Sequence, residues 1–269
     1  MWTSSPTDRV ADPAQGFGSC SSGKQPAWER SHALPLPTPP RTMEEDRAIC
    51  HERGNSLRWA SRAVGLLAAA LLCLIPWSTT ASAHGSVVDP ASRNYGCWLR
   101  WGDDFQNPEM AQKDPMCWQA WQDNPNAMWN WNGLYRNGSA GNFPAVIPNG
   151  QLCSGGHTES GRYNSLDTPG AWQTTNIGSK FTVKLYDQAS HGADYFKVYV
   201  SRQGYDPTTQ PLKWSDLQLV TTTGKYAPSQ NYSIDVSTSG YTGRHVVYTI
   251  WQASHMDQTY FLCSDVNFG

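Results

Sequence analysis

Six short segments between residues 180 and 268 alternate apolar with polar side chains, and this alternation constrains the fold more than any other feature of the chain. In the segment KFTVKLYD at 180–187, Phe181, Val183 and Leu185 are the alternating apolar residues. A period of two is typical of β-strands, whose successive side chains point to opposite faces. Gly, Pro, Ser or Asp separates this segment from 194–202, 216–223, 231–238, 244–252 and 259–268. The pattern predicts an antiparallel β-sandwich of the immunoglobulin or fibronectin-III-like kind.

Residues 92–150 do not follow this pattern and are rich in tryptophan. Pro, Asn, Asp and Gly interrupt the segment, so only short helices are expected, such as 115–123 and 126–135. We predict a partly helical loop excursion from the sandwich, and long ordered loops on a rigid scaffold are usually functional. Most of its tryptophans are expected to pack the excursion in place of a regular core. Six of the nine tryptophans of residues 84–269 lie in this segment: Trp98, Trp101, Trp118, Trp121, Trp129 and Trp131.

The one long apolar run of the chain, AVGLLAAALLCLIPW, occupies residues 63–77. It follows several arginines and precedes Ala81-Ser82-Ala83, a small-x-small cleavage site. Its length falls short of the roughly 20 residues of a membrane span. We therefore predict a secretory signal peptide over 43–83 rather than an uncleaved anchor, and an extracellular protein that begins at His84. Residues 1–42 lack apolar periodicity and are expected to be disordered or an over-extended gene model that precedes a true start at Met43.

The expected mature chain, residues 84–269, is long enough for one domain with a sizeable core, and no linker divides it. It contains 12 basic and 15 acidic residues, which gives a net charge of −3. This balance predicts neither a nucleic-acid partner nor an anionic membrane partner.

Four cysteines remain after the predicted cleavage, and an even set in an exported chain predicts two disulfides. Zinc is the alternative, but no C-x-x-C pair is present. The residues alone leave all three connectivities open. The four are Cys97, Cys117, Cys153 and Cys263.

Cleavage before His84 would place a free α-amine and an imidazole on one residue, where both can chelate a metal. The amine has an ordinary pKa near 8, so a metal can displace its proton at neutral pH. A second imidazole would complete a three-nitrogen site of the kind that suits copper. The candidates are His157, His191, His245 and His255, of which His191 stands in a turn between two predicted strands.

Three segments together resemble the bacterial lytic polysaccharide monooxygenases of auxiliary activity family ten, formerly classed as chitin-binding modules. They are HGSVVDPASRNYGC at 84–97, QASHGADYF at 188–196 and QTYFLCSDVNFG at 258–269. The likeness covers essentially all of residues 84–269 and is strongest to cellulose-active members from actinobacteria. It implies one copper ion held by His84 and His191.

The resemblance also implies roles around that copper. Ala189 matches a small residue that crowds one axial face, and Tyr260 faces the other side, where many members have Phe. Gln258 matches a Glu or Gln that positions oxygen species. Trp129 and Asn132 match residues that shape the substrate surface. An amide at Asn132, where strict C1-oxidisers have an aromatic residue, implies access to C4 as well.

The implied function is a secreted copper monooxygenase that cleaves crystalline cellulose at C1 and C4, with chitin as a second substrate. It would act as a monomer and use O2 or H2O2 with a small-molecule or protein electron donor. For the cysteines the resemblance favours the pairs Cys97–Cys117 and Cys153–Cys263.

Three other functions agree less well with the sequence. A non-catalytic carbohydrate-binding protein would account for the tryptophans but not for His84. An extracellular copper carrier would account for His84, but the methionines of this chain are scattered rather than clustered as in methionine-rich copper motifs. A glycosidase needs two carboxylates that flank the bond, and the glutamates Glu109 and Glu159 form no obvious pair.

Overall fold

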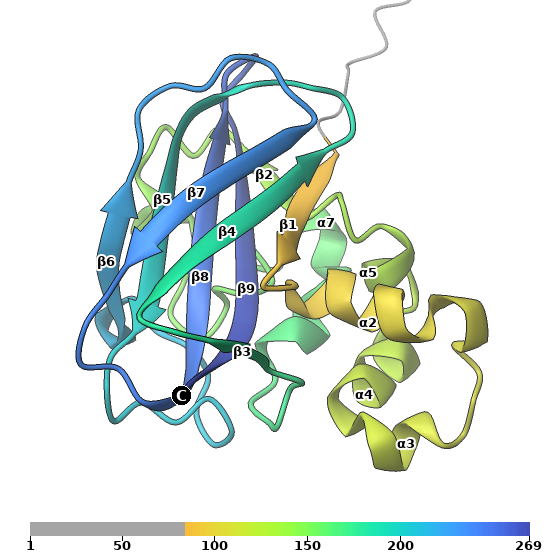
Figure 1. Ribbon diagram of the computed structural model, residues 1–269. Helices are drawn as coiled ribbons and strands as arrows, with labels where there is room; N and C mark the ends of the chain where they lie inside the picture. The colour runs from red at the N-terminus through yellow and green to blue at the C-terminus, as the bar shows by residue number, and fades with distance from the viewer. Residues whose placement is uncertain (1–83) are drawn as a thin grey trace, which may run out of the picture. The chain divides into compact units, whose positions relative to one another are not determined.

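A computed structural model describes residues 84–269, and the predictions for residues 1–42 and 43–83 lie outside the described residues. The strands of this part are β1 (Gly85–Asp89), β2 (Tyr135–Asn137), β3 (Thr175–Ile177), β4 (Lys180–Asp187), β5 (Ala193–Ser201), β6 (Leu217–Thr222), β7 (Asn231–Ser237), β8 (Gly243–Ala253) and β9 (Gln258–Phe268). They form two sheets that face each other (Figure 1). One sheet has the order β1-β4-β7, and the other has the order β2-β9-β8-β5-β6 with β3 paired to β9.

The predicted β-sandwich is confirmed, and each of the six alternating segments forms a strand, from β4 to β9. Neighbouring strands are antiparallel except β3, which runs parallel to β9. In β4, Val183 and Leu185 are buried while Lys184 between them is exposed, as a strand with one face on the core requires. In β7 the alternation is complete along all seven residues.

Strands β8 and β9 are buried on both faces, so their burial does not alternate. One face packs in the sandwich, and residues of the segment 143–152 contact the other. The Phe143 ring stands edge-on to Phe261 of β9, and the Tyr248 hydroxyl of β8 donates a hydrogen bond to the Leu152 carbonyl oxygen. The excursion therefore supplies a second apolar layer for the central strands.

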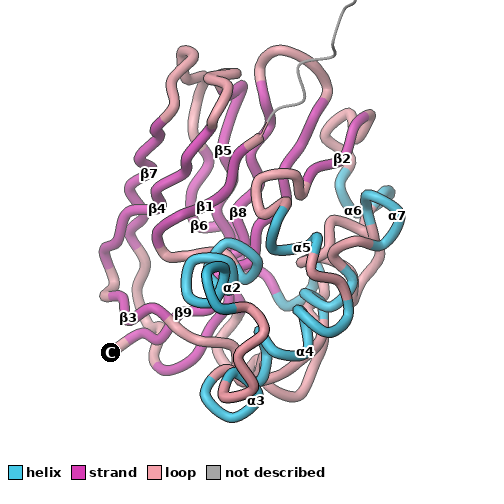
Figure 2. The backbone as a smooth tube through the Cα atoms, turned by 90° about the vertical axis from the view of Figure 1, so that its right-hand side faces the viewer, coloured by secondary structure: helices cyan, strands magenta, loops and turns pink. Residues whose placement is uncertain are grey.

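The tryptophan-rich excursion is helical, and its helices gather on one side of the strands (Figure 2). They are α2 (Arg93–Trp101), α3 (Met110–Lys113), α4 (Pro115–Asp123), α5 (Asn126–Trp129) and α6 (Phe143–Val146), with the 3-10 turn η1 (Gly102–Asp104). Helix α7 (Thr158–Gly161) and the 3-10 turn η2 (Asn164–Asp167) follow the excursion. A further 3-10 turn, η3 (Trp214–Asp216), precedes β6. The helix expected over 115–123 is present as α4, whereas the one expected over 126–135 ends at Trp129. None of the helices described here has the length and apolar character needed to cross a membrane.

The buried carboxylate of Asp114 joins α2 to α4. It caps α4 by accepting a hydrogen bond from the backbone N–H of Cys117, and Pro115 begins the helix. It also accepts hydrogen bonds from Arg100 Nε at 2.8 Å and Trp101 Nε1 at 3.0 Å, both on α2. A disulfide joins the same two helices, between Cys97 and Cys117.

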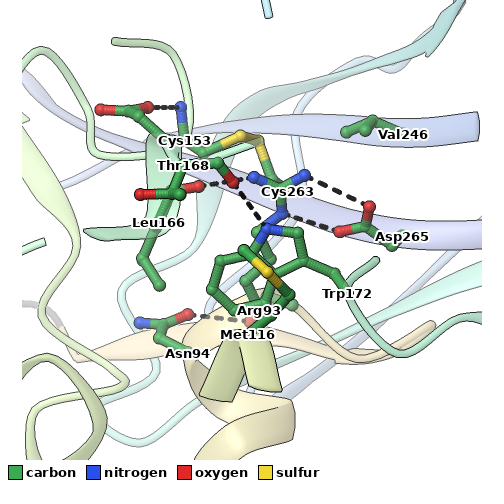
Figure 3. A network of polar contacts seen from close by, with 12 residues as sticks. Arg93, Asn94, Met116, Cys153, Leu166, Thr168, Trp172, Val246, Cys263 and Asp265 are labelled. Atoms are coloured by element: carbon green, nitrogen blue, oxygen red, sulfur yellow. Dashed lines mark hydrogen bonds and ion pairs between the residues drawn. A yellow bond between two sulfur atoms is a disulfide. The ribbon is translucent and has the colours of Figure 1, made fainter. Parts of the chain in front are cut away.

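A second disulfide, Cys153–Cys263, attaches the loop after α6 to β9, so both pairs have the connectivity that the resemblance implies. Beside it, a buried ion pair joins Arg93 of α2 to Asp265 of β9 (Figure 3). The guanidinium also donates to the Leu166 carbonyl oxygen and lies 4.8 Å from the centroid of the Trp172 ring. The ion pair thus attaches α2 to β9, and the disulfide attaches the loop after α6 to the same strand.

The buried carboxyl of Asp167 should make the stability of the protein depend on pH. Its Oδ1 accepts hydrogen bonds from the N–H groups of Cys153 and Ser154, but burial still raises its pKa to about 6. The unfolded chain releases this proton near pH 4. Between these values the unfolded state binds fewer protons, so stability falls as the pH rises.

We expect the free energy of unfolding to fall by up to roughly 3 kcal/mol between pH 4 and pH 7, relative to an Asp167→Asn variant. Chemical denaturation of both proteins across this range measures the difference. His157 lies 3.5 Å from Asp167 Oδ2, so a His157→Gln variant separates its titration from that of the carboxyl. Parallel stability curves for the Asn variant and the unaltered protein would contradict the assignment.

Candidate metal centre

His84 lies directly before β1, at the end of the sandwich opposite the C-terminus (Figure 1). Its carbonyl oxygen accepts a hydrogen bond of 2.8 Å from the N–H of Gln188. The next residue, Gly85, pairs with Asp187 and donates its N–H to the Asn132 carbonyl oxygen at 2.8 Å. A Cβ at position 85 would lie 2.7 Å from the Tyr186 oxygen and 2.8 Å from the Trp251 ring, so only glycine fits here.

His191 lies in the turn that joins β4 to β5, at the same end of the sandwich. Ser190 and Gly192 on either side adopt positive φ angles of 56° and 78°, which bend the backbone sharply. The His191 side chain is 5 % exposed. Its Nδ1 lies 2.9 Å from Asp187 Oδ1, which leaves Nε2 as the ring nitrogen available to another partner. Backbone contacts of Asp187 with Gly85 and of Gln188 with His84 therefore hold the segments of His84 and His191 side by side.

Tyr260 lies on β9 and is linked to the His191 turn through Trp251. Its ring stacks on Trp251 of β8 at 4.4 Å between centroids, and Trp251 in turn donates its Nε1–H to the Gly192 carbonyl oxygen. The Tyr260 hydroxyl is buried and makes no hydrogen bond within the described residues. Burial raises the pKa of this phenol far above its ordinary value, and the negative charge of Asp187 adds to the shift. Tyr260 therefore stays protonated at any physiological pH.

Gln258 is the buried first residue of β9 and shares a face with Tyr260, since Thr259 alone lies between them. The cross-strand pairs agree, because Tyr135 opposes Tyr260 and Asn137 opposes Gln258 on β2. The Gln258 side-chain amide donates to Asn137 Oδ1 at 3.2 Å. Ala189 is exposed in the turn before His191.

The other candidate histidines have different surroundings. The His255 ring is tilted against that of His191, with 4.2 Å between ring centroids, and burial together with electrostatic repulsion from His191 lowers the pKa of His255. His157 contacts Asp167 in the α7 region. His245 is buried in β8 and bonds Ser201 through Nδ1, a structural role. Among the described residues, no group of three or more His, Cys, Asp or Glu side chains is arranged to hold a metal.

Asn132 adjoins the His84 segment, whereas Trp129 stands on the excursion. The Asn132 side-chain amide donates to Gln188 Oε1 at 2.5 Å, so side chain and backbone both contact the residues around His84. Trp129 is 44 % exposed, and its ring is held edge-on by Phe105 and Trp121. An exposed aromatic ring supported from behind is suited to stacking against a flat ligand.

Asp187, Gln188 and Asn137 contact the predicted site residues but were not predicted from the sequence, whereas His255 was one of the four candidate histidines. Asp187 had a usable signal, because it ends a predicted strand four residues before His191. Asn137 had none, because its contact depends on the register of two strands that are 121 residues apart.

Comparison with known proteins matches this part of the chain to one family. The model of the family described as lytic polysaccharide mono-oxygenase, cellulose-degrading, matches residues 84–266. The crystal structure of a lytic polysaccharide monooxygenase (LPMO) from Kitasatospora papulosa is 81% identical and has a TM-score of 0.69, with 69% of this chain and 98% of that chain covered. ScLPMO10B in complex with zinc is 80% identical, with a TM-score of 0.69 over 69% of this chain and 100% of that chain. The cellulose-active LPMO CelS2 in complex with copper is 26% identical, with a TM-score of 0.60 over 69% of this chain and 99% of that chain.

Curated relatives are more distant. Chitin-binding protein CbpD of Pseudomonas aeruginosa is 32% identical, with 77% of this chain and 53% of that protein covered. The lytic cellulose monooxygenase of Streptomyces ambofaciens is 29% identical, with 70% of this chain and 54% of that protein covered. The chain thus spans about half the length of these curated relatives. Because the family match covers more than half of its residues and the fold agrees with that of solved members, the chain belongs to the lytic polysaccharide mono-oxygenase family.

Proposed function

We propose that this protein is a secreted, copper-dependent monooxygenase that oxidatively cleaves crystalline cellulose at C1 and C4, with chitin as a second substrate. The observation that carries the proposal is the position of the two histidines. His84 precedes β1 and His191 follows β4, and the hydrogen bond from Gln188 N–H to the His84 carbonyl oxygen holds the two segments together.

The donor chemistry at this end of the sandwich fits copper. In a chain that begins at His84, the α-amine, one imidazole of His84 and Nε2 of His191 provide three nitrogen donors. All four cysteines of the described residues form disulfides, so no thiolate competes. The buried Tyr260 hydroxyl lacks a hydrogen-bond partner among the described residues, and its ring stacks on Trp251, which donates a hydrogen bond to the turn after His191. Copper, when bound, supplies the one-electron and oxygen chemistry that side chains do not provide.

The remaining site residues shape the space around the metal. Tyr260 forms a wall of the site rather than a ligand, because its ring is packed against Trp251. Gln258 positions oxygen species by hydrogen bonding and cannot transfer a proton by titration. Ala189, in the turn before His191, would be the small residue that crowds one side of the metal site. The roles of Tyr260 and Gln258 require no change in the protonation of either side chain.

The substrate surface is proposed to include Trp129 and Asn132. The exposed Trp129 ring offers a face for the apolar side of a sugar ring, and the Asn132 amide offers hydrogen bonds for hydroxyl groups. A net charge of −3 for residues 84–269 agrees with an uncharged polymer as substrate. Cellulose is ranked first on the family description and on the Streptomyces relative, and chitin second on the Pseudomonas relative.

The proposal includes export and processing. Residues 43–83 would act as the signal peptide, and residues 84–269 would form a single monomeric catalytic domain. Two disulfides in this part agree with an oxidising, extracellular location. An external reductant, either a small molecule or a protein, would supply electrons.

A product assay tests this function. The chain that begins at His84 is loaded with copper and incubated with ascorbate on crystalline cellulose and, separately, on β-chitin. We expect aldonic acids and C4-oxidised sugars from cellulose by mass spectrometry, and none from the copper-free protein. Tight copper binding without oxidised products would favour a copper carrier. Binding to cellulose that is independent of copper, also without oxidised products, would favour a carbohydrate-binding protein.

A further inference from the structure

Asp187 is a buried carboxylate that pairs with no lysine or arginine in the described part of the chain. Its side chain is fully buried, and its one ionic contact there is with His191. A buried charge is costly unless several hydrogen bonds compensate for the lost water. Here the compensating donors all belong to the turn that contains His191.

Three donors converge on the two carboxylate oxygens. Oδ2 accepts a hydrogen bond of 2.5 Å from the backbone N–H of His191. Oδ1 accepts one of 3.1 Å from the N–H of Ala189 and lies 2.9 Å from Nδ1 of the His191 ring. An ionised carboxylate can only accept hydrogen bonds, so Nδ1 must carry a proton. In the neutral ring, Nε2 then holds the free lone pair.

The same residue is also fixed to the strand that follows His84. Asp187 is the last residue of β4 and pairs with Gly85, the first residue of β1. Its own N–H donates to the Gln230 carbonyl oxygen at 2.8 Å. The Asp187 backbone therefore sets the position of the His84 segment, while its side chain sets the orientation of the His191 ring.

We propose that Asp187 is a positioning residue that holds His191 as its Nδ1–H tautomer, with Nε2 as the metal donor, and that it strengthens this donor for Cu(II). The inference rests on the proposed copper centre. A carboxylate that accepts a hydrogen bond from a ligating imidazole raises the basicity of the ring. A more basic donor stabilises the doubly charged copper ion more than the singly charged one.

An Asp187→Asn variant tests the inference, since the amide has nearly the same shape but no charge. We expect the Cu(II) affinity to fall ten- to hundredfold, with a smaller change for Cu(I). If the Cu(I) affinity is unchanged, the Cu(II)/Cu(I) potential rises by about 59 mV for the tenfold loss and about 118 mV for the hundredfold loss. Competition titrations for both oxidation states and redox titration of the bound copper measure these changes without any substrate.

A charge-matched control is Asp89→Asn. Asp89 lies at the other end of β1 and forms an exposed ion pair with Lys184, so the variant removes the same charge without contact with His191. We expect its copper affinity and potential to equal those of the unaltered protein. Equal effects of the two variants, or no effect of Asp187→Asn, would overturn the inference.

Two further measurements are the tautomer of His191 and the copper affinity of a His191→Ala variant. If Asp187→Asn does not fold, nitrogen-15 NMR of the metal-free, unaltered protein reports the His191 tautomer directly. Protonated Nδ1 and unprotonated Nε2 are expected, and the reverse tautomer would refute the role of Asp187. Failure of the proposed function has a different signature, because a His191→Ala variant would then bind copper as tightly as the unaltered protein.

Discussion

Replacement of His191 by alanine is expected to lower the Cu(II) affinity of the chain that begins at His84 by more than about a hundredfold. Loss of a ligand should exceed the ten- to hundredfold cost of changing a residue that merely supports one. The remaining amine and imidazole of His84 would form only a two-nitrogen chelate. Titration against a chelator of known copper affinity measures the change.

The fold should survive this substitution. Asp187 would lose the imidazole but keep the backbone N–H groups of Ala189 and residue 191 as donors. A matched control is His157→Ala, which removes a partly exposed imidazole in contact with Asp167 and should leave copper binding unchanged. Equal affinities in the His191→Ala variant and the unaltered protein would place the copper elsewhere.

Removal of Asp265 alone is expected to lower the free energy of unfolding by about 3–5 kcal/mol, the usual cost of leaving one buried charge without its partner. Arg93 Nε lies 2.7 Å from Asp265 Oδ2, and the two side chains are 5% and 1% exposed. In an Asp265→Ala variant the guanidinium would keep only the Leu166 carbonyl oxygen and the Trp172 ring (Figure 3). Chemical denaturation at neutral pH measures the loss.

Two comparisons make this prediction specific. A double variant, Arg93→Met with Asp265→Leu, should regain most of the stability, because apolar residues of similar volume often replace a buried ion pair without loss. Asp89→Ala breaks the exposed pair with Lys184 and should cost less than about 1 kcal/mol. A loss below 1 kcal/mol for Asp265→Ala would show that the pair does not hold the excursion to β9.

The long strands were predictable because their apolar residues alternate, and the 180–187 segment became β4 with the same bounds. The short strands β2 and β3 were not predicted, because three residues are too few to show a period. Helix α2 was also missed, since Arg93 and Asn94 look like surface residues. Both are in fact buried, Arg93 against Asp265 and Asn94 through a hydrogen bond to the Trp131 carbonyl oxygen.

The residues proposed to hold the metal were inferred from local sequence motifs, whereas most of the residues that contact them were not. The resemblance pointed to His84, His191 and Tyr260 because each of them lies in a short sequence motif that resembles the family. Their contacts depend on strand register, which places Gly85 opposite Asp187 and Asn137 opposite Gln258. Local sequence carries no information about such register, so the structure was needed to find Asn137, whereas Asp187 could have been suspected from its place at the end of a predicted strand four residues before His191.

The most direct test of the copper centre compares two chains that differ by one residue. One begins at His84, and the other keeps Ala83 and therefore has no free amine on His84. We expect the first to bind Cu(II) more than about a hundredfold tighter, again beyond the cost of a supporting residue, and to show three nitrogen ligands by electron paramagnetic resonance. Equal affinity and identical spectra for the two chains would contradict a centre built on the amine of His84.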